Sequence, residues 1–147
     1  MVDANIAVKW TVKEDDSHVA NALLAEWRNQ NKFMMAPYLY AYEISNILLK
    51  KVRKNVLTIT GAQEAMTSLL DMEIEIRRPL DSKLNIRSLD IAYLFKLPAS
   101  YDAHYLALAE REQCEFWTAD ERLYNSVKGQ FSWVRLLSDH PYTATPA

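Results

Sequence analysis

The chain has 147 residues, of which 50% are apolar and 24% are charged, with 2 glycines and 1 cysteine. A chain of this length forms one domain that can bury about 70% of its unfolded surface; two glycines cannot build a glycine-rich phosphate loop, and the lone Cys114 excludes an internal disulfide and a cysteine-rich zinc site. With 17 basic and 19 acidic residues the net charge is −2, so binding to a nucleic acid would need a local basic patch or bound cations.

The composition also indicates where the protein works. The longest apolar run covers residues 33–42 and is too short to span a membrane, which takes about 20 residues. The chain starts Met1-Val2-Asp3, without the basic and apolar segments of a secretory signal. A single cysteine suits a reducing compartment. We therefore expect a soluble, cytoplasmic protein with no membrane contact.

The first elements in chain order are a short strand and two helices. The strand ends at Val2, directly before Asp3, and a short helix is expected over residues 6–10. Asp16 or Ser17 has the side-chain oxygen that caps a helix start, and it opens the longer helix that follows.

A second strand is expected over residues 33–36. Pro37 fits the first turn of the next helix, where its missing N–H costs nothing, and that helix ends in the basic run 50–54. Thr60 and Gln63 have the spacing of a capping box and predict the start of another helix.

The second half continues the alternation. Alternating apolar and charged residues predict a strand over residues 74–76. Asp81 or Ser82 then caps a helix that runs to about Phe95, and Ser100 caps the helix after it.

The last elements are a strand over 114–118, a helix over 121–127 and a strand over 131–136. Strands separated by helices imply crossover connections and a mostly parallel sheet with helices on both faces. The sequence therefore predicts a three-layer α/β/α domain over residues 1–138, with a frayed tail over residues 139–147.

Four carboxylates stand where chemistry is expected in such a fold. Asp3 and Asp120 follow strands directly, Glu43 lies in the helix after the second strand, and Asp102 lies in the first turn of its helix. Ligands of open parallel sheets bind outside the carboxyl ends of the strands, where these segments meet.

The position of two acids among apolar residues strengthens this interpretation. On a helix, residues four apart form a row, so Glu43 lies in the row of Leu39 and Ile47, and Asp102 in the row of Leu106. A carboxylate among core-facing residues is costly unless a cation or a donor compensates it.

A divalent cation with oxygen ligands explains the whole set. Several acids gathered at one place repel one another without a counter-ion, and Mg²⁺ or Mn²⁺ prefers carboxylate oxygens. One or two such ions favour hydrolysis of a phosphodiester bond.

Each acid also has a purely structural interpretation. Asp102 suits the positive end of a helix dipole, and Asp120 suits the N-cap of the helix that starts at Glu121. Asp3 can be exposed beside a charged terminus, and Glu43 can face water at the edge of the apolar stripe.

Four segments carry a resemblance to a known family: residues 3–10 (DANIAVKW), 36–48 (APYLYAYEISNIL), 101–110 (YDAHYLALAE) and 117–123 (WTADERL). In this order they resemble PIN domains over nearly the whole chain, and are most similar to the VapC-type toxins of bacterial toxin–antitoxin pairs. The resemblance implies a three-layer α/β/α fold and a ribonuclease that depends on Mg²⁺ or Mn²⁺. It also implies an RNA substrate, a homodimer and inhibition by a cognate antitoxin protein.

The resemblance assigns roles to individual residues. Asp3, Glu43, Asp102 and Asp120 match the acidic quartet of the family, with Asp3 and Asp102 as direct metal ligands. Family members usually have several more apolar residues before the first acid, so the first strand is expected to be short here.

Two polar residues match positions beside the quartet. Asn5 and Thr118 are expected to orient ligands or water.

Several residues keep two interpretations. The basic run 50–54 and Lys9 either steer RNA phosphates or form a solvated surface. Tyr38, Tyr40 and Tyr42 either stack on bases or serve packing and a dimer surface.

Two other classes of protein were weighed. A receiver-type signalling domain would show an acidic pair after the first strand and a lysine after the last, and the sequence has neither. A PIN-like binding module without catalytic activity is the alternative to an active ribonuclease, and the intact acidic quartet speaks against it.

Overall fold

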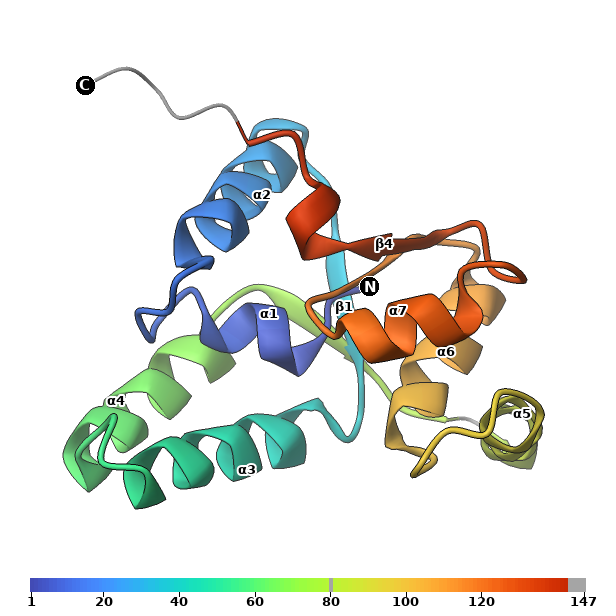
Figure 1. Cartoon of the computed structure of the whole chain (residues 1–147), viewed down its shortest axis with the longest axis horizontal. Helices are drawn as coiled ribbons and strands as arrows, with labels where there is room; N and C mark the ends of the chain where they lie inside the picture. The colour runs from blue at the N-terminus through green and yellow to red at the C-terminus, as the bar shows by residue number, and fades with distance from the viewer. Residues whose placement is uncertain (80, 143–147) are drawn as a thin grey trace.

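The computed structural model describes residues 1–79 and 81–142 (Figure 1). The helices are α1 (Ala4–Val8), α2 (Ser17–Asn29), α3 (Tyr40–Arg53), α4 (Ile59–Leu70), α5 (Ser82–Leu94), α6 (Tyr101–Glu112), α7 (Glu121–Val127) and the 3-10 helix η1 (Leu137–Asp139). The strands are β1 (Met34–Pro37), β2 (Ile74–Arg77), β3 (Phe116–Thr118) and β4 (Val134–Leu136).

The start of the chain joins two parallel strand pairs into one sheet. β1 pairs with β2, and β3 pairs with β4, both in parallel. Residues 1–3 lie between the pairs: the Val2 N–H donates to the Met35 carbonyl at 3.1 Å, and the Asp3 N–H donates to the Trp117 carbonyl at 3.0 Å. Val2 also forms a parallel bridge with Trp117. The order across the sheet is therefore β2, β1, residues 1–3, β3, β4, and the predicted parallel sheet is confirmed.

The two faces of the sheet bury different helices. One face packs on α2 and η1 through a small core of Val2, Ile6, Ala20, Leu23, Trp27 and Leu137. The other face supports the larger core, whose members include Ala36, Ile44, Leu69, Ile91, Leu106 and Phe116 from β1, β3 and helices α3 to α6. Because side chains alternate across a strand, adjacent strand residues enter opposite cores. α2 accordingly lies on the side away from α3 and α4 (Figure 1).

The prediction for Pro37 is wrong. Pro37 is the last residue of β1, in register with Arg77, and α3 begins only at Tyr40. A proline at the end of a strand removes no interior ladder hydrogen bond, so strand and helix start tolerate it equally well.

The start of α4 also differs from the prediction. Its N-cap is Thr58, whose hydroxyl accepts from the Gly61 N–H at 3.0 Å, so Thr60 and Gln63 lie inside the helix. Two threonines two residues apart offer the same cap chemistry, and the spacing of Gln63 favours the wrong one.

The chain ends differ from expectation as well. α1 starts at Ala4 because Asp3 caps it, two residues before the predicted start. The predicted tail begins at Asp139, but η1 includes that residue, the His140 ring lies 2.9 Å from Glu26 and the Tyr142 ring packs edge-on to His18. Residues 143–147 of the predicted tail lie outside the described residues.

Within residues 1–79 and 81–142, the structure has no helix with both the length and the apolar character needed to cross a bilayer.

Candidate functional site

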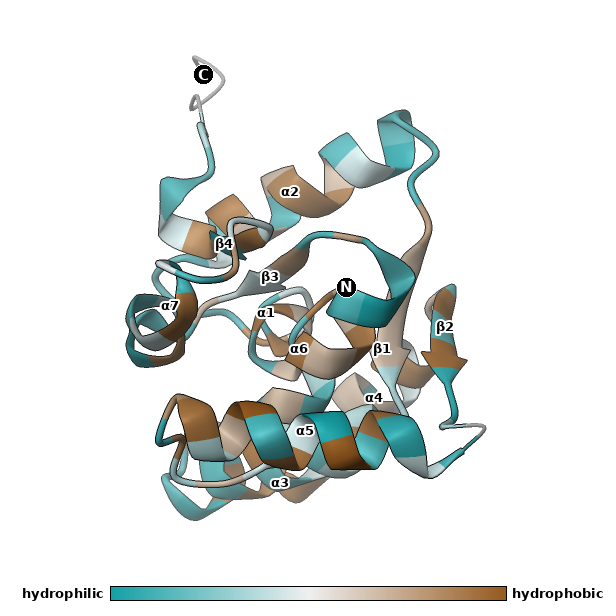
Figure 2. Cartoon of the chain, turned by 90° about the vertical axis from the view of Figure 1, so that its right-hand side faces the viewer, coloured by the Kyte–Doolittle hydropathy of each residue, from teal (hydrophilic) through white to brown (hydrophobic). Residues whose placement is uncertain are grey.

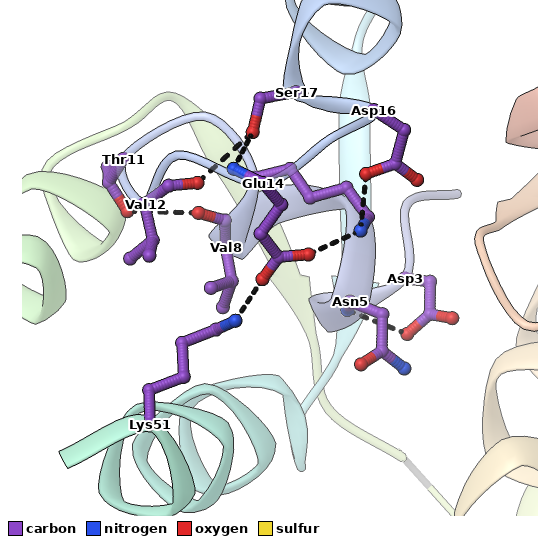
Figure 3. Close-up of polar contacts among 10 residues, drawn as sticks. Asp3, Asn5, Val8, Thr11, Val12, Glu14, Asp16, Ser17 and Lys51 are labelled. Atoms are coloured by element: carbon purple, nitrogen blue, oxygen red, sulfur yellow. Dashed lines mark hydrogen bonds and ion pairs between the residues drawn. The ribbon is translucent and has the colours of Figure 1, made fainter. Parts of the chain in front are cut away.

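Asp3 stands at the centre of the sheet's carboxyl edge. Its side chain is 3% exposed, so the interpretation of Asp3 as a solvent-exposed terminal residue is wrong. One carboxylate oxygen accepts from the Asn5 N–H at 3.1 Å and so caps α1 (Figure 3). The other accepts from the Thr118 hydroxyl at 2.6 Å. Both oxygens are therefore oriented by the protein, and each retains a second lone pair.

Thr118 connects Asp3 to Asp120. Its side chain is fully buried at the end of β3, and its hydroxyl accepts from the Asp120 N–H at 3.0 Å while it donates to Asp3. One hydroxyl thus fixes the carboxylate of one acid and the backbone of the next.

Asp120 is the N-cap of α7. Its Oδ1 accepts from the N–H groups of Arg122 and Leu123 at 2.8 and 3.1 Å. The cap interpretation of Asp120 is therefore confirmed. Both hydrogen bonds use the same oxygen, so capping leaves the second carboxylate oxygen of Asp120 for coordination of a metal ion.

Glu43 and Asp102 occupy the first turns of α3 and α6. Both side chains are half-buried. Burial raises the pKa of Glu43 to about 7; the nearby Tyr105 hydroxyl opposes this, and the charges of Asp3 and Asp102 add to it. Glu43 is thus poised to hold or release a proton near neutral pH.

Asp102 and Asp3 have the same kind of surroundings. Burial, followed by the charges of Asp3 and Asp120, raises the pKa of Asp102 to about 6. Burial and the charge of Asp120 raise the pKa of Asp3, although the Thr118 and Asn5 donors act against this rise. All four acids therefore belong to one electrostatic neighbourhood.

Two buried tyrosines complete this neighbourhood. The hydroxyls of Tyr40 and Tyr105 and the Oε2 atom of Glu43 are buried with no hydrogen-bond partner. Burial is the main cause that raises the pKa of both tyrosines. The charge of Asp3 adds to the rise for Tyr40, and the charges of Glu43 and then Asp3 add to it for Tyr105. This role of the two tyrosines was not predicted, although the spacing carried a signal: Tyr40 precedes Glu43 by three residues and Tyr105 follows Asp102 by three, which places each pair on one helix face.

The carboxylate oxygens of the four acids are the kind of ligand that a hard divalent cation prefers, but the side chains are not arranged around a common point. Across the described parts of the chain, no three histidine, cysteine, aspartate or glutamate side chains lie close enough together to hold a metal ion as they stand. Asp3 and Asp120 are drawn toward the backbone groups that they cap. The buried, unpartnered oxygen of Glu43 and the mutually raised pKa values nevertheless mark a place where a cation would offset unfavourable negative charge.

Lys9 and Lys51 are engaged in ion pairs. The Lys9 ammonium lies 2.5 Å from Glu14 and 2.8 Å from Asp16, and Lys51 of α3 pairs with the other oxygen of Glu14 (Figure 3). Burial lowers the pKa of Lys9, but its bonds to Asp16 and Glu14 outweigh this and leave it raised. Lys9 and Lys51 therefore hold α1, the following loop and α3 together, and the interpretation that they steer RNA phosphates is not supported.

The comparison with protein families identifies the class of this chain. The family model of the PIN domain matches residues 1–128, which include all four acids and every described element except β4 and η1. The chain belongs to the PIN domain family, a family of nucleases that typically use divalent metals. No curated protein is similar enough to this chain to count as a relative.

Proposed function

We propose that this protein is an endoribonuclease that hydrolyses RNA phosphodiester bonds with Mg²⁺ or Mn²⁺. The observation that carries the proposal is the electrostatic coupling of Asp3, Glu43, Asp102 and Asp120 at one edge of the sheet, in a chain of the PIN family. Burial is the main cause of the raised pKa values of Asp3, Glu43 and Asp102, and the charges of the neighbouring acids add to it, which indicates that the carboxylates lie close together.

Each acid has a distinct part in the proposed mechanism. Asp3 and Asp102 are the first metal ligands, and Asp120 and Glu43 complete the set. When bound, the cation would lower the pKa of an attacking water and neutralise charge on the phosphate. Without the cation, burial raises the pKa of Glu43 to about 7, and a bound cation would hold this carboxylate in its charged form at neutral pH.

Thr118 and Asn5 act by orientation in this proposal. The Thr118 hydroxyl and the Asn5 N–H hold the two oxygens of Asp3 from opposite sides. A fixed carboxylate binds a cation without first losing side-chain freedom, so these donors support the ligand without touching substrate.

Replacement of Asp102 by Asn separates a catalytic from a structural role. The parent protein should cleave single-stranded RNA with Mg²⁺ or Mn²⁺ and stop in chelator. Asp102→Asn keeps the shape but removes a charged ligand, so the cleavage rate should fall on the order of 10²-fold or more. Because one repelling charge is removed, the melting temperature of the variant in chelator should equal or exceed that of the parent.

A matched control is the exposed Asp71→Asn, at the C-terminal end of α4, which should leave both quantities unchanged. Retained cleavage by Asp102→Asn, or a sharp fall of its melting temperature in chelator, would return Asp102 to a purely structural part. A parent protein that binds RNA without cleaving it under any divalent cation would support the alternative, a PIN-like binding module.

The finer assignment is the toxin of a toxin–antitoxin pair. Its support is the similarity of residues 3–10, 36–48, 101–110 and 117–123 to VapC-type toxins, which implies a cognate antitoxin. A small DNA-binding protein should be encoded next to this gene, and its co-expression should relieve the growth arrest that the active protein causes. Growth unaffected by the active protein would contradict this assignment.

We also propose that the protein is a homodimer. The support is an apolar stripe on α5, where Ile86, Leu89, Tyr93 and Leu94 are 57–87% exposed. Figure 2 shows several brown, hydrophobic bands along α5. Residues three, four and seven apart share one face of a helix, so the stripe is a continuous surface that a second copy can cover.

A further inference from the structure

A small aromatic cavity lies at the starts of α3 and α6, the two helices that carry Glu43 and Asp102, and is not used by the proposed hydrolysis. It has a volume of about 250 Å³, its lining is mainly apolar, and its wall includes Pro37, Tyr38, Arg77, Asn85, Tyr101 and His104. Sites for drug-sized ligands have volumes of about 300–1,000 Å³, so this one suits a single ring system.

The aromatic part of the wall comes from the two helix starts that carry Glu43 and Asp102, and the ends of β1 and β2 and the start of α5 complete it. Tyr38 lies two residues before the first residue of α3, and Tyr101 directly precedes Asp102 at the start of α6. A nucleotide whose phosphate is bound by Glu43 and Asp102 would thus have the cavity at the starts of the same two helices.

The aromatic rings of the wall are accessible. Tyr101 is 63% exposed and Tyr38 is 47% exposed. Tyr38 packs edge-on against Tyr42 at 6.1 Å, and the Arg78 guanidinium lies 5.1 Å from the centre of the Tyr38 ring. Bases of single strands stack on such rings, and an arginine beside the ring adds cation–π attraction and charge for the phosphate.

Polar groups of the wall match the edge of a base. The Nδ1 atom of His104 lies 2.7 Å from the Ser100 carbonyl. A carbonyl only accepts, so Nδ1 donates in this contact, and Nε2 is the ring atom left to contact a base. The amide of Asn85 offers both a donor and an acceptor, and the buried Nε atom of Arg77 has no hydrogen-bond partner.

We propose that this cavity is a base-binding subsite that holds one unpaired nucleobase of the single-stranded RNA next to the scissile phosphate. Stacking on Tyr38 and Tyr101 holds the ring, and the Asn85 amide with Nε2 of His104 contacts its edge. This subsite rests on the proposed nuclease function, because its position is defined by the acids. It explains why the enzyme would prefer loops and single strands, whose bases are free to leave the stack.

The test measures RNA binding separately from cleavage. A labelled single-stranded RNA is titrated by fluorescence anisotropy in the Asp102→Asn background with Mn²⁺, where cleavage is suppressed. Tyr38→Leu and Tyr101→Leu keep apolar volume but remove the ring, and each should weaken binding on the order of ten-fold. Tyr38→Phe and Tyr101→Phe keep the ring and should bind like the background protein. Phe33→Leu changes an aromatic residue that is 88% exposed elsewhere and serves as the matched control.

A second arm locates the base itself. A single base-free position is moved along the RNA, and one such position should weaken binding to the background protein as much as Tyr101→Leu does. The same base-free RNA should cost the Tyr101→Leu variant nothing further, because the two changes remove one contact. If the base-free position weakens binding to the Tyr101→Leu variant as much as it weakens binding to the background protein, the proposal is overturned.

Other outcomes separate this proposal from the nuclease function. If the parent cleaves RNA, but both leucine substitutions leave RNA binding unchanged in the Asp102→Asn background and leave cleavage unchanged in the parent background, the subsite is wrong and the nuclease function stands. If the parent does not cleave RNA but the base-dependent binding is found, the subsite stands and the nuclease function fails. If the leucine variants keep RNA binding but dissociate in sedimentation, the cavity belongs to a protein contact and the subsite is wrong.

Discussion

A single buried hydroxyl orders half of the candidate site. The Thr118 side chain touches Asp3 through a 2.6 Å hydrogen bond and the Asp120 backbone through a 3.0 Å one. The Thr118 side chain has no exposed surface, so water cannot replace its hydroxyl. Removal of the hydroxyl therefore leaves the Asp3 carboxylate oxygen and the Asp120 N–H without these hydrogen-bond partners. The geometry of two acids thus depends on a residue that has no charge of its own.

Thr118→Val tests this dependence. Valine has the same shape, but it leaves an oxygen of Asp3 and the Asp120 N–H unsatisfied, which should cost at least about 2 kcal/mol of unfolding free energy. Thr118→Ser keeps the hydroxyl and loses one buried methyl group, which should cost about 1 kcal/mol. Urea unfolding of both variants measures the difference, and a valine variant as stable as the serine variant would contradict this account.

Some residues of the site could be predicted from the sequence and others could not. The four acids could be found because each follows a strand or opens a helix, and the order of the elements brings such positions to one edge. The orienting parts of Thr118 and Asn5 entered only through the family resemblance, because a hydroxyl or an amide after a strand is common. For Tyr40 the sequence indicates base stacking or packing; the closeness of its hydroxyl to Asp3 depends on how distant segments pack and could not be predicted.

At the scale of elements, Glu14 ties three segments together. It lies in the loop between α1 and α2 and pairs with Lys9 just after α1 and with Lys51 of α3. Burial raises the pKa of Glu14, but its bonds to Lys51 and Lys9 outweigh burial and leave the pKa below its usual value. A carboxyl whose pKa is lowered by folding adds stability above its unfolded pKa and loses it as pH falls through the folded value.

Glu14→Gln should therefore destabilise the protein in a pH-dependent way. At about pH 7 the variant should be less stable than the parent by about 1–3 kcal/mol, the usual loss of a charged hydrogen bond. The difference should shrink as the pH falls through the lowered pKa of Glu14 and its carboxyl in the parent becomes protonated. Urea unfolding at neutral and at acidic pH measures this, with Glu64→Gln on the exposed side of α4 as control. A difference that does not change with pH would show that the ion pairs contribute nothing.

Helix boundaries illustrate how far local sequence signals reach. α5 and α7 start where Asp81 and Asp120 predict them, because one carboxylate accepts from the first free N–H groups. Pro37 and Thr60 were misplaced because a proline suits two environments and two nearby threonines compete for one cap. Only packing of the finished fold decides between such equal alternatives.

At the scale of the whole molecule, the central strand position is filled by the first three residues. They connect the β1–β2 pair with the β3–β4 pair and deliver Asp3 to the middle of the carboxyl edge. The parallel order could be predicted from the alternation of strands and helices, whereas the central place of residues 1–3 depends on pairing partners more than 30 residues away.

The α5 surface predicts an assembly. Leu89→Glu places a charge in the centre of the apolar stripe, so the dimer should dissociate to a monomer in sedimentation at micromolar concentration. Leu70→Glu makes the same change at a half-exposed site on α4 and should leave the dimer intact. A parent protein that is a monomer under these conditions, or a Leu89→Glu dimer, would contradict the assignment of this surface.

The central claim is that the four acids together hold a divalent cation, and calorimetric titration with Mn²⁺ tests it most directly. Metal binding displaces protons from its ligands. Asp3, Glu43 and Asp102 have raised pKa values, about 7 for Glu43 and about 6 for Asp102, so binding near pH 6.5 should release at least about one proton, and binding near pH 8.5 fewer. Titrations in buffers of different ionisation enthalpy measure this number, because the observed binding enthalpy changes in proportion to the protons released. Fewer released protons at pH 8.5 than at pH 6.5 is the predicted result; absence of millimolar binding, or equal numbers at both pH values, would contradict the account.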